Sequence, residues 1–214
     1  MEIEHIEKKH VYETYQTIST RFDKTRGYVW PCLTEFLDKL SVGSKLLEIG
    51  CGNGKNLMYR SDLKQTGVDF VPNFVQICKD RGLNVLEANA LELPFDDNCF
   101  DTVISVAVFH HLGSEERRKM ALIEMNRVLQ PGGKGLVVCW AYEQEYKGQK
   151  SLIKRVVGKG DQYVSWKDKD KNKLGDRFYY FYDRDQFITY TETISVKEKR
   201  IYWEEGNWIF EFTK

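Results

Sequence analysis

The sequence has no net charge, because 32 lysines and arginines balance 32 aspartates and glutamates. A strongly basic chain would indicate a nucleic-acid partner by its overall field; here only local charge can serve that role. Long apolar runs are also missing, so no segment is long enough to span a bilayer. The first residues, MEIEHIEKKHVYETY, are charged and lack an apolar centre, which argues against a signal peptide.

Paired cysteines are missing as well. The five cysteines are odd in number and form no Cys-x-x-Cys spacing, which argues against a zinc knuckle or a disulfide frame and indicates reduced thiols. We therefore expect a soluble cytoplasmic protein, with a nuclear location also open. A chain of 214 residues is long enough for one sizeable core, and we expect a single domain over residues 1–214.

Short apolar strands alternate with helical segments through the first two thirds of the chain. The expected strands are residues 44–50, 65–70, 83–90, 100–109 and 134–141, and the expected helices are residues 5–22, 30–40, 54–62, 73–82 and 114–129. This alternation predicts an α/β fold, with a parallel sheet covered by helices on both faces. Two aromatic segments, residues 177–187 and 196–214, are expected to add end strands to the same sheet.

The segment between these two parts is basic. Residues 147–177 carry ten lysines or arginines and four acids, a local net charge of +6. A solvated loop is the ordinary explanation of such a run. An insert that faces RNA is the functional alternative, and its candidates for phosphate contacts are Lys154, Arg155 and Arg177.

The segment LLEIGCGNGKN follows an expected strand and has the form E-x-G-x-G-x-G, with glycines at 50, 52 and 54. Glycine lets the backbone turn tightly and lets a ligand approach the peptide plane. A second expected strand ends at Asp69, nineteen residues after Gly50, where an acid accepts hydrogen bonds from ribose hydroxyls. The glycines alone fit any tight turn, but together with the acid they favour an adenosine-type cofactor.

This loop departs from the dinucleotide fingerprint G-x-G-x-x-G and resembles the class I S-adenosylmethionine-dependent methyltransferases. The resemblance implies a Rossmann-like fold with a seven-stranded, mostly parallel sheet, and S-adenosylmethionine as the cofactor. The cofactor-binding residues that it implies are Glu48, Gly50, Gly52, Asn53, Gly54, Asp69, Phe70, Asn89, Ala90, Leu91 and Val106. Asn89 stands where the family often has aspartate, and its amide oxygen can still accept from the adenine amino group. Phe70 either stacks on the purine or packs in the core.

Two histidines end the fourth expected strand, in the segment ISVAVFHHLGSEERR. The resemblance places this strand end beside the transferable methyl group. Adjacent residues at a strand end point to different sides, so two ligands for one metal are not expected here, and we predict no metal site. We assign His110 to the substrate side and His111 to packing, with the reverse order open.

A longer match narrows the family. The segments HVYETYQTISTRFDKTRGYVWP, ISVAVFHHLGSEERRKMALIEMNRVLQPGGKGLVVCWAYEQE, YVSWK, RFYYFY and GNWIFEF together resemble eukaryotic tRNA methyltransferases that esterify 5-carboxymethyluridine at the wobble position. This resemblance implies a methyl ester product, the tRNA anticodon loop as substrate, and a heterodimer with a small zinc-binding activator protein. The activator would add a strand beside the third strand, near residues 83–88, unless a loop of this chain covers that edge.

The acceptor would then be a carboxylate, which is ionised at pH 7 and needs no strong base. We hypothesise that Arg26 binds it as a planar fork, the alternative being a surface salt bridge, and that His110 donates to it or shapes the pocket. Residues 1–40 would cover the cofactor site, with Tyr15 or Trp30 either closing the pocket or packing in the core. A methyltransferase of a small quinone-like or sterol-like molecule, or a scaffold without turnover, are the competing functions.

Overall fold

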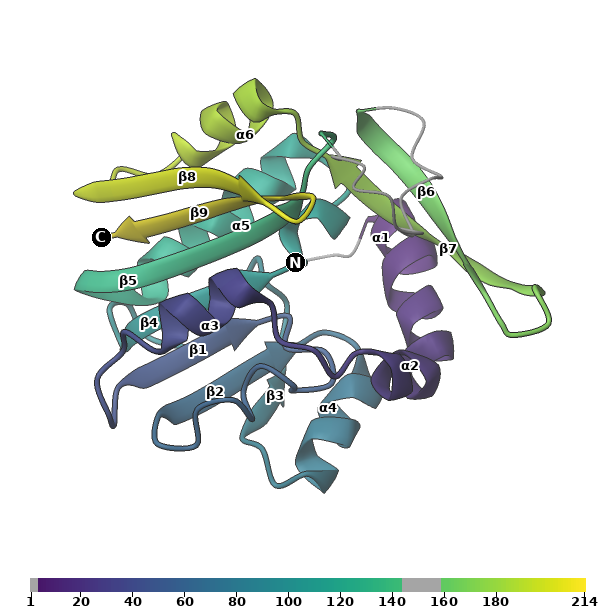
Figure 1. The fold of residues 1–214 in the computed structure, drawn as a ribbon, viewed down its shortest axis with the longest axis horizontal. Helices are drawn as coiled ribbons and strands as arrows, with labels where there is room; N and C mark the ends of the chain where they lie inside the picture. Colours follow the sequence, from purple (N-terminus) through teal and green to yellow (C-terminus); the bar gives the residue numbers. More distant parts are fainter. Residues whose placement is uncertain (1–3, 144–158) are drawn as a thin grey trace.

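The computed structural model describes residues 4–143 and 159–214. Its centre is a seven-stranded sheet (Figure 1). In spatial order its strands are β3 (Val85–Glu87), β2 (Lys64–Asp69), β1 (Lys45–Ile49), β4 (Phe100–Val106), β5 (Leu129–Trp140), β9 (Asn207–Thr213) and β8 (Glu198–Glu204). The first five are parallel, and β9 runs antiparallel to both of its neighbours. The predicted seven-stranded, mostly parallel sheet is confirmed, and its strand order reverses between β1 and β4.

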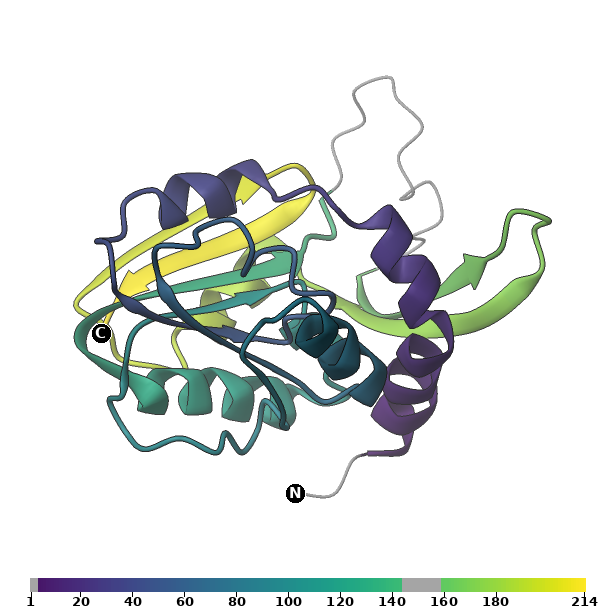
Figure 2. The same cartoon turned by 90° about the horizontal axis from the view of Figure 1, so that it is seen from below.

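Helices cover both faces of this sheet (Figure 2). Helix α3 (Pro31–Leu37) packs its apolar side on one face, against residues such as Leu46 and Ile104. Helix α5 (Glu115–Val128) packs on the opposite face, against residues such as Leu47 and Val103. Neighbouring residues of one strand thus face two separate cores, which is why the central strands read as continuous apolar runs.

Helix α5 begins where the sequence predicts. The hydroxyl of Ser114 accepts a hydrogen bond from the backbone N–H of Arg117, so this serine caps the helix. Helix α4 (Pro72–Asp80) follows β2 and buries Phe74 and Val75. No helix in the described ranges is long and apolar enough to cross a membrane.

The N-terminal helices stand across the carboxyl ends of the strands (Figures 1 and 2). The short α1 (His5–Glu7) continues through a π-helical turn (Lys8–Tyr12) into α2 (Glu13–Thr25). Ile18 of α2 is fully buried against a cluster that includes Phe74 and Phe178. The helix predicted over residues 5–22 is confirmed. It covers the carboxyl ends of the strands, which is the edge of the sheet at which ligands bind in α/β folds.

A separate two-stranded sheet lies beside these N-terminal helices. Strands β6 (Gly160–Lys167) and β7 (Lys173–Phe181) pair with each other and project from the main body beside α2 (Figure 1). The prediction that RFYYFY joins the main sheet is therefore wrong. Alternate β7 side chains pack in two directions, Phe178 toward α2 and Tyr179 toward the histidine segment, so the strand is buried without joining the sheet.

Two further predictions are wrong. Residues 54–62 form turns and not a helix; the Arg60 guanidinium there donates to the carbonyls of Leu37 and Leu40, which ties the turns to the end of α3. Helix α6 (Arg184–Thr191) begins within the segment 177–187 predicted as a strand. Its start is marked by a capping box, in which Asp183 and Gln186 each bond the other's backbone N–H.

Candidate active site

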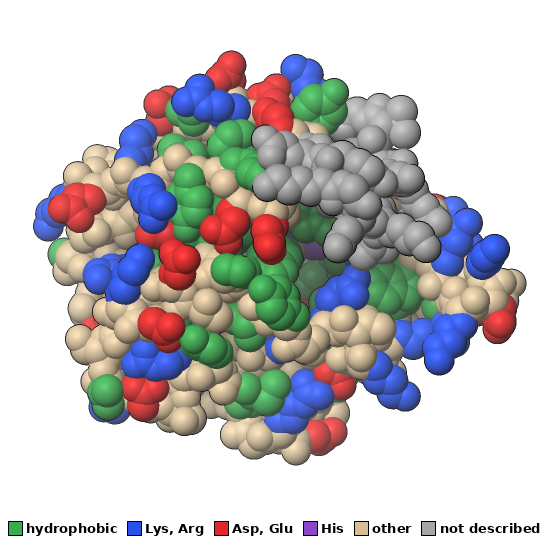
Figure 3. Space-filling model, in the orientation of Figure 1, with side chains coloured by type: hydrophobic (Ala, Val, Ile, Leu, Met, Phe, Trp, Pro, Cys, Tyr) green, Lys and Arg blue, Asp and Glu red, His purple; other side chains and the backbone are tan. Residues whose placement is uncertain are grey.

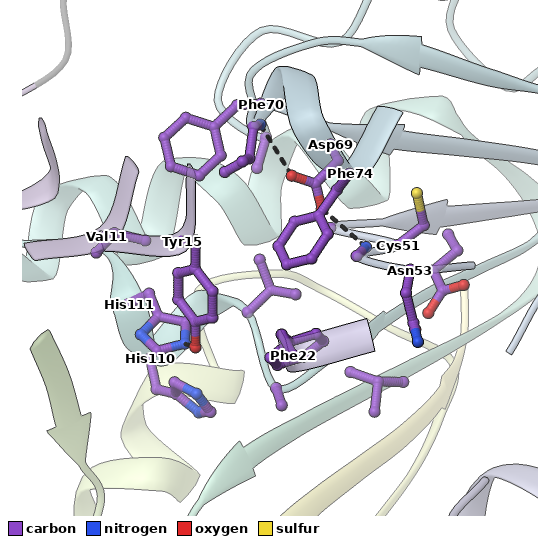
Figure 4. Close-up of a pocket in the computed structure, with 18 of the residues that line it drawn as sticks. Val11, Tyr15, Phe22, Cys51, Asn53, Asp69, Phe70, Phe74, His110 and His111 are labelled. Atoms are coloured by element: carbon purple, nitrogen blue, oxygen red, sulfur yellow. Dashed lines mark hydrogen bonds between the residues drawn. The ribbon is translucent and has the colours of Figure 1, made fainter. Parts of the chain in front are cut away.

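A pocket lies at the carboxyl ends of β1, β2 and β4, between α2 and β7. Figure 3 shows the molecular face hollowed here, with a histidine visible at the bottom and lysines and arginines gathered on the hairpin side. Figure 4 shows that its walls come from segments far apart in the sequence: the N-terminal helices, the glycine loop, the end of β2 and the histidine segment. The fold therefore joins most of the predicted site residues in one cavity.

The glycine loop forms the floor of one half of the pocket. Gly50, Gly52 and Gly54 all have positive φ, of 72°, 53° and 74°, a region that side chains disfavour. A Cβ on Gly50 would lie 2.4 Å from Val108 Cγ2, and one on Gly54 would lie 2.4 Å from Leu83 Cδ1. Gly50 and Gly52 line the cavity, whereas Gly54 does not and lets the loop pack closely against Leu83, which precedes β3, and Cys78 of α4.

Asp69, at the end of β2, is held rigidly beside this loop. Its Oδ2 accepts from the Gly52 N–H at 2.8 Å and its Oδ1 from the Val71 N–H at 2.9 Å (Figure 4). Burial raises its pKa to about 6, against which the backbone hydrogen bonds act. Each carboxylate oxygen keeps a lone pair, so Asp69 can accept two hydroxyls of a ribose, as the sequence predicts.

Two buried acceptors beside the loop have no hydrogen-bond partner in the part of the chain that the structure describes. Glu48 accepts at Oε1 from Asn56 Nδ2, at 2.6 Å, but Glu48 Oε2 and Asn56 Oδ1 are both unpaired, and both residues line the pocket. Burial raises the Glu48 pKa to about 8. A cationic donor would satisfy both oxygens. The ammonium of the methionine end of S-adenosylmethionine is such a group, so this half of the pocket fits the cofactor.

The side of the pocket assigned to adenine is only partly as expected. Phe70, Ala90 and Val106 line the cavity, but Leu91 is buried behind it in the main core. Asn89 also lines the cavity, and its Oδ1 already accepts from the Leu91 N–H at 3.0 Å. An amide oxygen has a second lone pair, so an adenine contact stays available to Asn89.

Asn53 connects the glycine loop to the N-terminal cover. Its Nδ2 donates to Asp23 Oδ1 at 2.9 Å and to the Arg26 carbonyl at 3.0 Å. Arg81, from the end of α4, pairs with the same Asp23 carboxylate at 2.8 Å and donates to the Asn53 carbonyl. The role assigned to Asn53 therefore extends beyond the loop, because it fixes the end of α2 over the cavity.

The two histidines lie in a 3₁₀ turn (Phe109–His111) after β4, which ends at Val106. Both rings line the pocket and lie 4.6 Å apart, so the prediction that they point to different sides is wrong. His110 Nδ1 accepts from the Trp140 N–H at 3.0 Å, which puts the proton on Nε2. His111 Nδ1 donates to the Phe178 carbonyl, so its Nε2 accepts from the Tyr15 hydroxyl at 3.0 Å.

Both imidazoles are neutral near pH 7. Burial, followed by the positive charge of Arg177, lowers the pKa of His111 to about 3. Burial and the neighbouring His111 and Arg177 place the His110 pKa well below its usual value. Both nitrogens of His111 have partners, which fits the packing role predicted for it, while the buried His110 Nε2–H has no partner among the described residues. His110 is therefore a free donor at the pocket wall.

Arginine side chains occupy the same half of the pocket as the histidines. Arg26 lines the cavity as proposed, with its guanidinium over the rings of Phe22 and Trp166. Arg177, assigned from sequence to RNA phosphates, is 6% exposed and lies in the pocket wall. The other two candidates for phosphate contact, Lys154 and Arg155, lie outside the described residues.

Comparisons with known proteins agree with this geometry. The family model described as "Methyltransferase domain" matches residues 47–137. A Schizosaccharomyces pombe protein named tRNA (carboxymethyluridine(34)-5-O)-methyltransferase is 37% identical over 166 residues, which cover 78% of this chain and 71% of that protein. The chain belongs to this family of tRNA (carboxymethyluridine(34)-5-O)-methyltransferases. The family predicted from the sequence is thus confirmed.

Longer members of the tRNA (carboxymethyluridine(34)-5-O)-methyltransferase family match the chain over part of their length. The Mus musculus member, named with the suffix ALKBH8, is 44% identical over 159 residues, 73% of this chain and 24% of its own. The Arabidopsis thaliana member is 44% identical over 140 residues, 65% of this chain and 35% of its own. The chain therefore spans about a quarter to a third of the length of these relatives.

Solved structures show the fold. A Thermotoga maritima SAM-dependent methyltransferase superposes with a TM-score of 0.69 at 19% identity, over 95% of this chain and 100% of the other. A Haloferax volcanii methyltransferase, solved in complex with the Trm112 methyltransferase activator, gives 0.67 at 17% identity, over 95% and 96%. This family member therefore has the class I methyltransferase fold.

Cofactor binding should depend on pH through Asp69. Only the ionised carboxylate accepts two ribose hydroxyls, and its pKa is raised to about 6, so affinity should rise as the pH rises through 6. We expect Asp69 to weaken S-adenosylhomocysteine binding about tenfold at pH 5 relative to pH 7, in addition to the effect of Glu48, whose pKa is raised to about 8; calorimetry on the unmodified protein and on Asp69→Asn gives the Asp69 share as the difference. The Asp69→Asn variant should bind weakly at both values. An equal pH dependence in this variant would contradict the assignment.

Some pocket residues were missed in the sequence. Trp140 lies in a predicted strand and ends β5, and its indole stacks on the Tyr179 ring, with ring centroids 4.4 Å apart and planes 15° from parallel. Ala107 has a φ of 61°, a strained value for a non-glycine residue that starts the turn toward the histidines. Nothing in the local pattern signals either feature. Tyr15 and Trp30, proposed as residues that close the pocket, both line it.

Proposed function

We propose that this protein transfers the methyl group of S-adenosylmethionine to the carboxylate of 5-carboxymethyluridine at the tRNA wobble position. The observation that carries the proposal is the chemistry of the acceptor half of the pocket. Two guanidiniums, of Arg26 and Arg177, face it together with the neutral His110 imidazole. A hydroxyl or amine acceptor would need a base there, whereas a carboxylate is already ionised and needs a cationic site.

The reaction does not require a side chain of the protein to remove a proton from the acceptor. S-adenosylmethionine supplies a methyl group on a sulfonium; one carboxylate oxygen forms the new C–O bond, the C–S bond breaks, and its electron pair stays on sulfur. The charges of the two reactants cancel, so a neutral ester and a neutral thioether result. The residues of this chain hold the attacking carboxylate oxygen in line with the methyl–sulfur bond. The stacked rings of Trp140 and Tyr179 line the acceptor half of the pocket and exclude water from it.

The substrate would be the anticodon loop of a tRNA. A loop base can be turned out of the stack and placed in such a pocket. The basic segment 147–177 includes β6 and the start of β7, so its described part borders the pocket. We keep Lys154 and Arg155 as proposed phosphate contacts. Arg177 is better suited to the pocket than to a phosphate, because it is buried.

A small zinc-binding activator protein is the proposed partner. Strand β3 is the last strand on its side of the sheet within the described ranges, and Leu86 on it is 40% exposed. An open parallel edge can accept a strand from another protein. The structural neighbour from Haloferax volcanii was solved with a methyltransferase activator, which supports a partner of this kind here.

The test is transfer of labelled methyl from S-adenosylmethionine to tRNA that carries unesterified carboxymethyluridine. We expect label in the tRNA, lost on mild alkaline hydrolysis because it is a methyl ester. The assay is run with and without co-expressed activator, and tRNA with a plain wobble uridine is the control. If cofactor binds but neither condition gives label, the small-molecule methyltransferase or the scaffold without turnover is the better function.

A further inference from the structure

The buried polar atoms of the pocket that have no hydrogen-bond partner fall into two groups, acceptors in one half of the pocket and donors in the other. Within residues 4–143 and 159–214, four residues that line the pocket carry such an atom. Glu48 and Asn56, beside the glycine loop, offer oxygens that accept hydrogen bonds. His110 and Arg177, in the other half, offer Nε2–H and Nε–H groups that donate. One end of the cavity therefore lacks a cationic donor, and the other end lacks an anionic acceptor.

Arg177 is the charged member of the donor pair. It lies on β7 with its guanidinium 4.8 Å from the Trp166 ring centroid and 5.2 Å from that of Tyr179. No acid lies within ion-pair distance of it in residues 4–143 and 159–214. A buried cation is costly unless a counter-charge meets it, so this site is built for an anion that arrives from outside.

Arg26 is placed differently, although it faces the same ring. Its guanidinium lies 5.3 Å from the Trp166 centroid, and Asn53 of the glycine loop donates to its backbone carbonyl. Its Nη1 already donates to the carbonyl and hydroxyl of Thr25, and it is more exposed than Arg177. Burial and the charge of Arg177 lower its pKa, so the two cations repel each other across the pocket.

We infer that Arg177 and His110, and not Arg26, hold the carboxylate that accepts the methyl group. This deepens the proposed function and rests on it. A carboxylate has two oxygens: the Arg177 Nε–H and the His110 Nε2–H bind one of them, and the other attacks the methyl carbon. Both donors come from elements that close the pocket, β7 and the 3₁₀ turn, so they are fixed before the substrate arrives.

The experiment separates binding from turnover. Calorimetry compares the nucleoside 5-carboxymethyluridine with its neutral amide, in the presence of S-adenosylhomocysteine, and methyl transfer to tRNA is measured in parallel. The unmodified protein should prefer the carboxylate at least about tenfold. Arg177→Gln should abolish this preference and lower kcat/KM about 100-fold or more, while S-adenosylhomocysteine affinity stays within about twofold. Arg177→Lys restores charge without the Nε–H, and should recover the preference only in part.

Two arginines serve as comparisons. Arg26→Gln should keep the preference for the carboxylate over the amide. Arg200→Gln removes a guanidinium that also stacks on an aromatic ring, that of Tyr202 on β8, away from the pocket, and should change neither measurement. The inference is overturned if Arg26→Gln loses the preference and Arg177→Gln keeps it, or if the unmodified protein shows none. If the preference depends on Arg177 but no tRNA is methylated, the inference stands and the proposed reaction fails.

Discussion

Replacing Gly50 by alanine should disable the cofactor site and destabilise the protein. The residue has a φ of 72°, and a Cβ there would lie 2.4 Å and 2.7 Å from the two methyl carbons of Val108. The left-handed conformation costs about 1–2 kcal/mol for a residue with a side chain, and forced overpacking adds about 1–3 kcal/mol. Val108 directly precedes the histidine turn, so its displacement also moves His110. We expect S-adenosylhomocysteine to bind more than about tenfold more weakly, because the loop must shift by more than a hydrogen bond tolerates.

Gly43 provides the matched control. Its φ is 79°, but a Cβ added there meets nothing within 4 Å. Gly43→Ala therefore reports the cost of the backbone conformation alone, and the difference between the two variants reports the collision with Val108. Thermal unfolding and calorimetric binding measure both. If Gly50→Ala is no worse than Gly43→Ala in either measurement, the close approach of the loop to Val108 is not needed.

Replacing Glu7 by alanine should cost more stability than any surface change. Its carboxylate is buried, and it accepts from Arg117 Nε at 2.7 Å, from Arg117 Nη2 at 2.6 Å and from the Gly113 N–H at 2.8 Å. It thus fastens the first helix to α5 and to the loop after the histidines. Removing one member of a buried ion pair costs about 3–5 kcal/mol. For a chain of this size we expect the Tm to fall by about 10 °C.

Glu4 is the control for this prediction. It also faces Arg117, with Oε1 3.9 Å from Nε, but its side chain is 41% exposed. An exposed pair of this kind contributes about 0–1 kcal/mol, so Glu4→Ala should leave the Tm nearly unchanged. Equal effects of the two variants would show that burial of the Glu7 carboxylate adds nothing. Methyl transfer should also fall in Glu7→Ala, because the helices that it holds cover the pocket.

Local rules explain the parts of the fold and site that the sequence predicts. The glycine loop could be recognised because only glycine suits three positive φ values in five residues. Asp69 could be recognised because it ends an expected strand nineteen residues after Gly50, which is the sequence spacing at which an acid binds the ribose. The central strands are apolar on both faces, which is typical of a parallel sheet under two helical layers.

Other features depend on contacts between distant segments and could not be predicted. Strand β7 reads as an end strand because its aromatic residues suit either sheet equally well. The histidines were placed by the period of a strand, but a 3₁₀ turn rotates about 120° per residue, so two neighbours can face one cavity. Arg177 comes from a basic run that suggests a surface, and its burial follows from Trp166 and Tyr179 packing around it. One local signal in the sequence could have predicted helix α6, namely the capping box formed by Asp183 and Gln186.

The partners that fix the two imidazoles are main-chain groups: the N–H of Trp140 and the carbonyl of Phe178. A change of side chain at either position leaves these groups in place, since every residue except proline has the same amide. The positions of the imidazole protons are therefore inherited with the path of the backbone and do not depend on neighbouring residue identities. Substitutions around the pocket can therefore change the side chains of its walls while the His110 Nε2–H stays available as a donor.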